Sequence, residues 1–119
     1  MSARHVLLVT VVTALAAVST FLRRVEVRGD SMLPALRPGD RLLVVRTTRA
    51  RPGQIVLVDD PRRRWCPLVK RVETVHAGMV VVTGDNTAAS TDSRVFGPVK
   101  VRSRAVYRYH PAGRTGWLR

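Results

Sequence analysis

The chain contains few of the residues from which disulfides and metal sites are built. Its 119 residues include one cysteine, Cys66, which excludes an internal disulfide and any zinc site held by a pair of cysteines. The three histidines, His5, His76 and His110, lie far apart in the sequence. We therefore expect no metal and no other cofactor. Cys66 is interpreted as a packed thiol, because no histidine stands near it in the sequence to activate it.

Acidic and aromatic side chains are also scarce. Only 8 Asp and Glu residues oppose 21 Lys and Arg residues, so the formal net charge is +13. Such a charge favours an anionic partner, either nucleic acid or an anionic lipid surface. Aromatic residues make up 5% of the chain, and no stacking motif accompanies the scattered arginines. We therefore expect no specific nucleic-acid partner, and a lipid bilayer is the preferred one.

One long apolar run lies near the amino end. Residues 6–22 carry no charge, and as a helix they would span about 25 Å, close to the lower limit for crossing a bilayer. We predict an uncleaved transmembrane anchor over residues 5–22, since no polar face marks a soluble core helix. A cleavable signal peptide is the alternative, because residues 14–16 resemble a cleavage site. Arg23 and Arg24 favour a cytoplasmic carboxyl side, but this rule is weak before a folded domain, so the orientation stays open.

After residue 23 the apolar pattern changes to a period of two, which indicates short strands separated by turns. The predicted fold is a small, mostly antiparallel β domain over residues 23–110, with a sheet or barrel-like arrangement and no internal repeat. A basic tail over residues 111–119 contains two glycines and a proline and is expected to be loosely held. The expected strands cover residues 25–28, 42–45, 54–58, 67–75, 79–83 and one or two strands within 99–109.

The stretch from Gly29 to Asp40, GDSMLPALRPGD, predicts a turn with a hydroxyl at its apex. Gly29 tolerates tight backbone geometry, and Pro34 fixes the chain after the turn, so Ser31 could project into a cleft. Most serines on turns instead bond to local backbone groups. Both interpretations of Ser31 stay open on this pattern alone.

Lys70 occupies an otherwise apolar face of its predicted strand, a face that it shares with Leu68 and Val72. In one interpretation the ammonium reaches water at the edge of the sheet. In the other, burial lowers the pKa of the amine until it can accept a proton near neutral pH. An amine of the second kind can activate a serine hydroxyl.

Several short motifs follow one another through the predicted domain, from residue 27 to about residue 101. They are Ser31-Met32 with Pro34, Gly39-Asp40, Pro52-Gly53, Pro61, Lys70-Arg71-Val72, Gly84-Asp85-Asn86, Ser90 to Arg94, and Gly97-Pro98-Val99. In this order they resemble the conserved boxes of the type I signal peptidases, the membrane-anchored serine-lysine proteases. Only thirteen residues separate Lys70 from Gly84, so the chain resembles a compact form without the large extra domain of some relatives.

The resemblance implies a membrane-bound serine endopeptidase in which Ser31 is the nucleophile and Lys70 the general base. It implies that the Ser90 hydroxyl orients the lysine amine, and that Asp92 and Arg94 form a pair that braces the adjacent loop. From the residues alone, Asp92 and Arg94 could equally form an ordinary surface ion pair. Cleavage would proceed through an acyl-enzyme, with the product released by water.

The resemblance also implies the rest of the site and its substrate. The backbone N–H of Ser31 is the expected oxyanion donor, and many relatives add a serine where this chain has Gly29. Val25, Met32 and Leu33 flank the nucleophile and are expected to line the substrate pockets. The expected substrates are precursor polypeptides with small residues before the cut, and the expected location is the cell membrane, single-pass, with the catalytic domain extracytoplasmic.

Three alternatives remain. A compact relative could mature one dedicated precursor, such as nickel superoxide dismutase, in the cytoplasm. The self-cleaving repressor peptidases share the serine-lysine pair, but no DNA-binding helices precede the domain here. A protein of another class, a membrane-tethered basic protein that binds an anionic polymer without catalysis, would require Ser31 and Lys70 to lie far apart.

Overall fold

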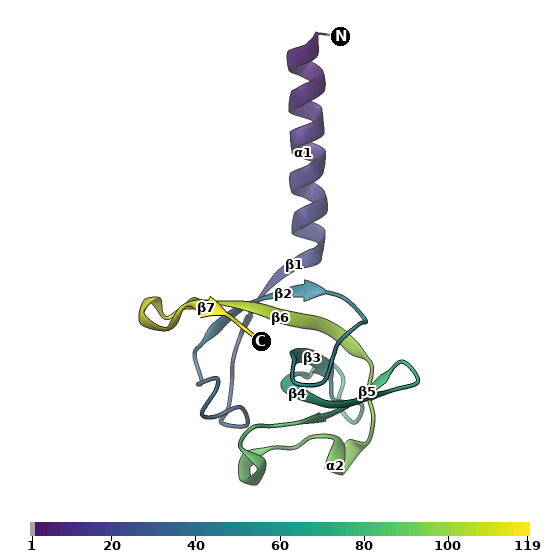
Figure 1. The fold of residues 1–119 in the computed structure, drawn as a ribbon, viewed down its shortest axis with the longest axis vertical. Coiled ribbons are helices and arrows are strands. Elements are labelled where there is room, and N and C mark those ends of the chain that lie inside the picture. The colour runs from purple at the N-terminus through teal and green to yellow at the C-terminus, as the bar shows by residue number, and fades with distance from the viewer. Residues whose placement is uncertain (1) are drawn as a thin grey trace.

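The described chain consists of one amino-terminal helix followed by a β domain (Figure 1). The structure is a computed structural model that describes residues 2–119, with the side chains of residues 17–20 outside the described part. Helix α1 (Ala3–Phe21) leads directly into strand β1 (Leu22–Glu26). The further strands are β2 (Arg41–Arg46), β3 (Ile55–Asp59), β4 (Pro67–His76), β5 (Met79–Thr83), β6 (Val101–His110) and β7 (Gly116–Trp117). The short helices are η1 (Thr87–Ala89), α2 (Ser93–Phe96) and η2 (Ala112–Arg114).

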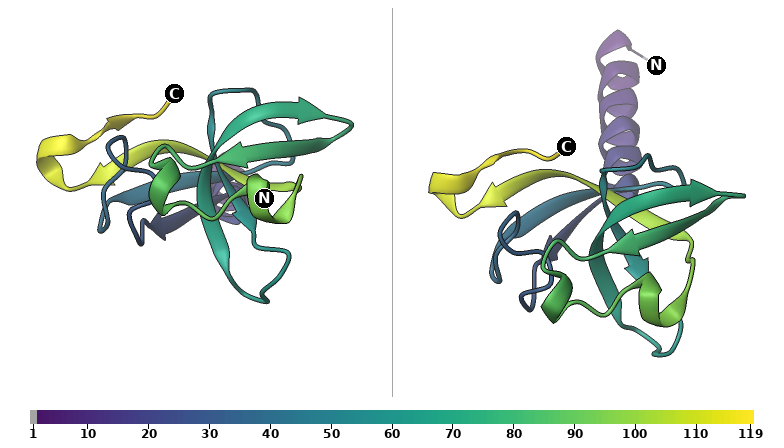
Figure 2. Two further views of the ribbon diagram at one scale, coloured as in Figure 1. Left: turned by 90° about the horizontal axis from the view of Figure 1, so that it is seen from below. Right: turned by 60° about the horizontal axis from the view of Figure 1, so that its bottom comes forward.

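The strands form one sheet in the order β1-β2-β6-β3-β4-β5, with β7 added on β6, and every pair of neighbours is antiparallel. The predicted mostly antiparallel β fold is therefore confirmed. Strand β6 pairs with both β2 and β3, so the carboxyl-terminal part of the chain lies in the middle of the sheet. Figure 2 shows the long β4–β5 hairpin extending away from the rest of the sheet.

Alternating apolar residues from the strands form two buried clusters. The first gathers around the turn that follows β1 and consists of Val27, Met32, Leu36, Leu42, Val44, Ile55 and Ala105. The second lies between β3, β4, β5 and the start of β6 and consists of Val56, Val58, Val72, Val80, Val82, Val99 and Val101. β-Branched residues at every second position suit such a half-buried pleated surface. Met32 and Leu36 tie the Ser31 turn to the first cluster.

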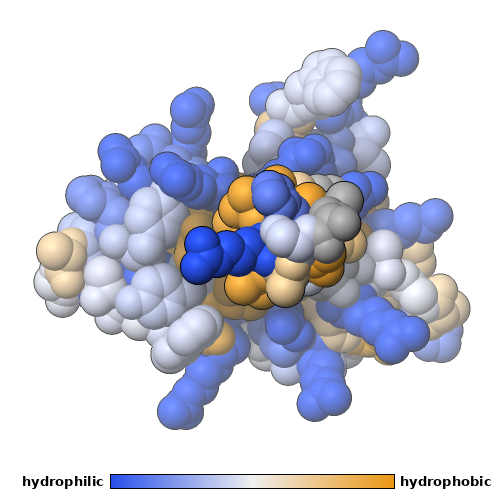
Figure 3. All heavy atoms as spheres, turned by 90° about the horizontal axis from the view of Figure 1, so that it is seen from above, coloured by the Kyte–Doolittle hydropathy of each residue, from blue (hydrophilic) through white to orange (hydrophobic). Residues whose placement is uncertain are grey.

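Helix α1 projects away from the β domain, and all of its described side chains are exposed (Figure 1). Figure 3, which looks down the helix, shows apolar residues at the centre and many hydrophilic side chains on the domain around them. The hydroxyl groups of Thr10 and Thr13 donate hydrogen bonds to the backbone carbonyls of Val6 and Val9, at 2.9 Å each. Within the part of the chain that the structure describes, no helix combines the length and the apolar character needed to cross a membrane.

The carboxyl-terminal tail is packed on the sheet, so the expectation of a loosely held tail is wrong. The rings of Tyr107 and Trp117 meet edge to face with centroids 4.9 Å apart. The Leu118 N–H donates to the Val106 carbonyl at 2.9 Å, and the Leu118 side chain packs against the first cluster. The sequence pattern missed this because β7 contributes only two residues, too few to show a period of two.

Candidate active site

Ser31 lies on the turn that the sequence predicts, in the loop between β1 and β2. Gly29 has a φ of 73°, a left-handed conformation that favours glycine and turns the chain just before the serine. The base of the loop is closed by backbone hydrogen bonds, from Val27 N–H to the Asp40 carbonyl and from Gly39 N–H to the Val27 carbonyl, at 2.8 Å each. The serine is half-buried. Its position is therefore fixed by the loop base and by the core packing of Met32.

A buried carboxylate holds the far end of this loop. Asp40 is 2% exposed and accepts hydrogen bonds from the Arg37 N–H at 2.9 Å, from Arg114 Nη1 at 2.6 Å and from Arg108 Nη1 at 3.3 Å. Arg108 also donates to the Ala35 carbonyl at 3.0 Å, inside the loop. The two arginines come from β6 and η2, so the tail of the chain braces the serine loop. In the sequence, Gly39-Asp40 is one of the motifs behind the resemblance, but nothing there pairs Asp40 with Arg108 or Arg114.

Lys70 lies in the middle of β4, opposite Val56 of the central strand β3. It is 3% exposed, so the interpretation in which its ammonium reaches water at the sheet edge is wrong. Nζ donates a hydrogen bond to Ser90 Oγ at 2.9 Å. Burial lowers the pKa of Lys70 below the ordinary lysine range; the Asp92 carboxylate opposes this shift and the Arg94 guanidinium adds to it. The site therefore favours the neutral amine more than water does.

Ser90 connects the lysine to a fully buried carboxylate. The Ser90 hydroxyl donates to Asp92 Oδ2 at 2.9 Å, and the same oxygen accepts from the Gly84 N–H at 3.1 Å. Arg94 contacts both carboxylate oxygens, from Nε to Oδ1 at 2.9 Å and from Nη2 to Oδ2 at 3.2 Å. Burial by itself would raise the pKa of Asp92, but these hydrogen bonds outweigh it and hold the pKa well below its usual range. Asp92 is thus an anionic acceptor that fixes the direction of the Ser90 O–H.

The three residues after β5 each make a different contact. A Cβ at Gly84 would lie 2.5 Å from Ser90 Cβ and 2.7 Å from the Ser31 carbonyl oxygen, with Ser90 Oγ nearer still, so a side chain there would push Ser90 and the serine turn out of place. Asp85 forms a bidentate ion pair with Arg71 of β4, with both N–O distances 2.8 Å. The Asn86 N–H donates to the Ser31 carbonyl at 2.8 Å, and its side-chain amide donates to the Asp30 carbonyl at 3.1 Å. This segment therefore joins the serine turn to the lysine strand.

Ser31 and Lys70 line one cleft of about 550 Å³. Of the residues expected to form the substrate pockets, Val25 and Met32 belong to its lining, whereas Leu33 is not in the lining that the structure describes. Sequence reasoning missed most of the other walls, which come from β3, β4 and the loop before β4. These further lining residues include Leu57, Trp65, Cys66, Pro67, Leu68 and Val69. Cys66 is half-buried in this wall, and Trp65 is 91% exposed at its rim.

The hydrogen bonds among the described residues leave Ser31 with two free groups. None of these bonds joins Ser31 Oγ to Lys70 Nζ, whose acceptor is Ser90. Catalytic hydrogen bonds are often long in unliganded sites and tighten when substrate binds, so this geometry does not exclude a role for the pair. The Ser31 N–H has no acceptor within residues 2–119. It is available as a donor at the apex of the turn.

The fold and the site define a class of protein: an antiparallel β domain behind an apolar helix, with a serine turn and a buried lysine on the walls of one cleft. The sequence model of the family described as "Signal peptidase, peptidase S26" matches residues 2–75, more than half of the chain. The chain belongs to this family of signal peptidases, so it is a signal peptidase-like protease. The matched range includes Ser31 and Lys70 and ends before Ser90. None of the curated proteins compared with the chain matches it.

Proposed function

We propose that the chain is a serine endopeptidase that removes amino-terminal signal peptides or pro-peptides from precursor proteins, with Ser31 as nucleophile and Lys70 as general base. The observation that best supports this is the environment of Lys70. Its amine is buried, its pKa is lowered by that burial, and its hydrogen-bond acceptor is a neutral hydroxyl and not a carboxylate. A lysine held for structure alone would gain more from a direct ion pair, because an unpaired buried charge is costly.

The proposed chemistry uses groups on the walls of the cleft. Neutral Lys70 accepts the proton of Ser31 Oγ as this oxygen attacks the scissile carbonyl carbon. The Ser31 N–H donates to the resulting oxyanion, and the lysine ammonium then protonates the leaving amine. An acyl-enzyme remains; water then attacks its acyl carbon and gives a proton to the same lysine, which passes that proton to the departing Ser31 Oγ as the carboxylic acid product is released. Ser90, fixed by Asp92, keeps the amine oriented during both steps.

We propose that α1 anchors the protein to a lipid bilayer and that the β domain acts on the extracytoplasmic side. The exposed apolar side chains of the helix support an anchor, as do its threonine hydroxyls, which bond to the helix backbone. The basic surface of the domain would suit anionic headgroups. The described part of α1 does not by itself have the length and apolar character to cross a membrane, and the proposed anchor includes residues 17–20, whose side chains lie outside the described part.

The test uses the purified full chain in uncharged detergent and a precursor with alanine at the first and third positions before its cut. We expect one cleavage, immediately after the second alanine, with the new amino terminus identified by mass spectrometry. The control precursor carries leucine at the same two positions and should stay intact. A mock preparation from cells without the chain controls for host proteases. Cleavage of both precursors alike, or of neither, contradicts a general signal peptidase.

A dedicated maturation protease is the second candidate, and the small size of the domain favours it. Such an enzyme would leave the test precursor intact and cleave only its own substrate. A library of peptides joined to one reporter separates the two candidates. A general enzyme should accept many sequences with small residues before the cut, whereas a dedicated one should require further positions around it.

The acid limb of the pH profile should shift when Asp92 is changed. The base works in its neutral form, so kcat/KM rises as the pH passes through the pKa of Lys70. Asp92 raises that pKa, so Asp92→Asn should lower it and move the acid limb to lower pH, in addition to any loss of maximal rate. Asp59→Asn removes an exposed carboxylate that pairs with Arg102 and should leave the limb in place. A limb that moves upward in Asp92→Asn would contradict Lys70 as the base.

A further inference from the structure

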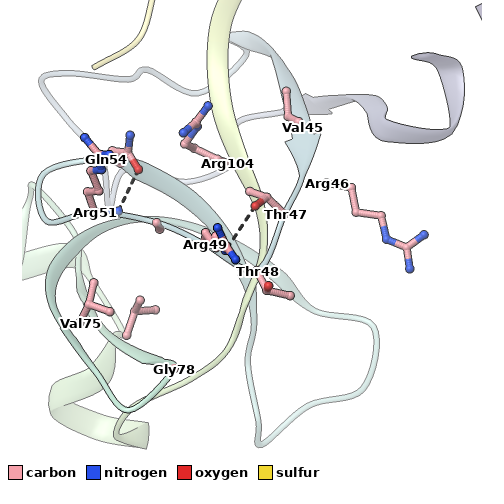
Figure 4. Close-up of a pocket in the computed structure, with 12 residues that line it drawn as sticks. Val45, Arg46, Thr47, Thr48, Arg49, Arg51, Gln54, Val75, Gly78 and Arg104 are labelled. Atoms are coloured by element: carbon pink, nitrogen blue, oxygen red, sulfur yellow. Dashed lines mark hydrogen bonds between the residues drawn. The ribbon is translucent and has the colours of Figure 1, made fainter. Parts of the chain in front are cut away.

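A second cavity, of about 860 Å³, lies on a part of the domain that shares no residue with the cleft of Ser31 and Lys70. Figure 4 shows it between the loop that joins β2 to β3, the β4–β5 hairpin and strand β6. Arg49 and Arg51 come from the loop, Arg104 from β6, and Arg46 lies at the edge with its guanidinium turned outward. The lining contains no Asp or Glu.

Every polar side chain of this wall can donate a hydrogen bond. Gln54 Oε1 accepts from the Arg51 N–H at 2.9 Å, which leaves the Gln54 side-chain N–H groups free. Thr47 Oγ1 accepts from the Arg49 N–H at 3.1 Å, so its hydroxyl proton is free as well. These two bonds also brace the loop that carries the arginines. The backbone of the loop is therefore held in place without a ligand, so binding would require ordering of the arginine side chains and not folding of the loop.

The arginines of the cavity have no partner inside the described chain. The guanidinium groups of Arg49, Arg51 and Arg104 take part in none of the hydrogen bonds or ion pairs within residues 2–119. The ion pairs that are present occupy carboxylates elsewhere: Glu26, Asp40, Asp59, Asp60, Asp85 and Asp92. Like charges around one hollow repel one another, and an anionic ligand would remove that cost.

We propose that this cavity binds the phosphate group of an anionic ligand. A guanidinium matches phosphate oxygens in a planar, bidentate way, and several together suit a group with more than one negative charge. Val75 and Val80 of the β4–β5 hairpin add apolar lining, as does Ala50 of the loop, and the volume exceeds that of one phosphate. The ligand is therefore an organic phosphate with an uncharged part, taken either from a lipid headgroup or from solution.

The experiment titrates inorganic pyrophosphate into the full chain, held in uncharged detergent micelles, and measures binding by calorimetry. The variant Arg49→Gln/Arg51→Gln/Arg104→Gln should bind at least about 100-fold more weakly, because charge-assisted hydrogen bonds are lost. The control Arg37→Gln/Arg63→Gln/Lys100→Gln removes the same charge from exposed side chains outside the cavity and should bind nearly as well as wild type. The single variant Arg49→Gln, on an exposed loop position, gives a weaker loss without risk to folding.

Adding phosphatidylglycerol or phosphatidylcholine to the micelles distinguishes a lipid headgroup from a soluble phosphate as the natural ligand. Competition by phosphatidylglycerol alone assigns the site to an anionic headgroup, whereas no competition by either lipid assigns it to a soluble phosphate. The proposal is overturned if wild type does not bind pyrophosphate, or if the two triple variants lose affinity equally. Binding of an oligonucleotide without binding of pyrophosphate would also overturn it, in favour of a nucleic-acid surface. None of these variants touches the residues proposed for catalysis.

Discussion

Ser31→Ala and Lys70→Arg are each expected to reduce cleavage of the precursor by at least about 10⁴-fold, the loss typical when a member of a catalytic unit is removed. Ser31→Ala removes the only oxygen that would form the acyl-enzyme. Lys70→Arg keeps a positive charge but supplies a guanidinium, which stays protonated and cannot accept the serine proton. Because both changes disable one step, the double variant should be no slower than either single variant. The measurement is kcat/KM by product formation, with each protein titrated for concentration.

Lys70→Met is the control that separates lost chemistry from lost structure. Methionine has nearly the length of lysine and no charge, so it should fill the buried position on β4 without the cost of desolvating an amine. We expect Lys70→Met to unfold at a temperature equal to or above that of wild type while showing no cleavage. Appreciable cleavage by Lys70→Arg or by Lys70→Met would assign the base to another residue.

The strands could be predicted because their pattern is local. The period of two located β2 to β6 to within a few residues, and the apolar run located α1. The order of the strands could not be predicted, because the pairing of β6 with both β2 and β3 depends on contacts between distant segments. The packing of the tail was missed for a similar reason. One of its contacts joins Arg114 to Asp40 at 2.6 Å, two residues that nothing in the sequence marks as a pair.

The candidate site, too, could be predicted from the sequence only where its signals are local. A lysine among apolar residues on a strand is a local signal that marks Lys70 as a candidate, and the resemblance to the signal peptidases implies its role as the base. The direct ion pair of Asp92 and Arg94 was also foreseeable, since the two residues are close in the sequence. In contrast, the ion pair of Arg71 with Asp85 joins strand β4 to the loop after β5, and Leu57 reaches the cleft from strand β3, so neither could be read from neighbouring residues.

Gly84→Ala is expected to lower kcat/KM by at least about 100-fold although position 84 takes no part in the chemistry, because small displacements of reacting groups carry such costs. An added methyl group would lie 2.5 Å from Ser90 Cβ and 2.7 Å from the Ser31 carbonyl oxygen. Both neighbours would have to move apart, and one belongs to the serine turn while the other orients the lysine. Overpacking at this buried position should also cost about 1–3 kcal/mol of stability.

Gly113→Ala is the matched control, since the same methyl group there meets no atom within 4 Å. It should change stability by less than about 0.5 kcal/mol and leave cleavage unchanged. To separate displacement from unfolding, both variants are assayed well below their unfolding midpoints, and the pH profile is recorded. If Gly84→Ala separates Ser90 from Lys70, the acid limb should move as well as the maximal rate. Wild-type kcat/KM in a folded Gly84→Ala variant would mean that the close approach of the two segments at Gly84 is not needed for cleavage.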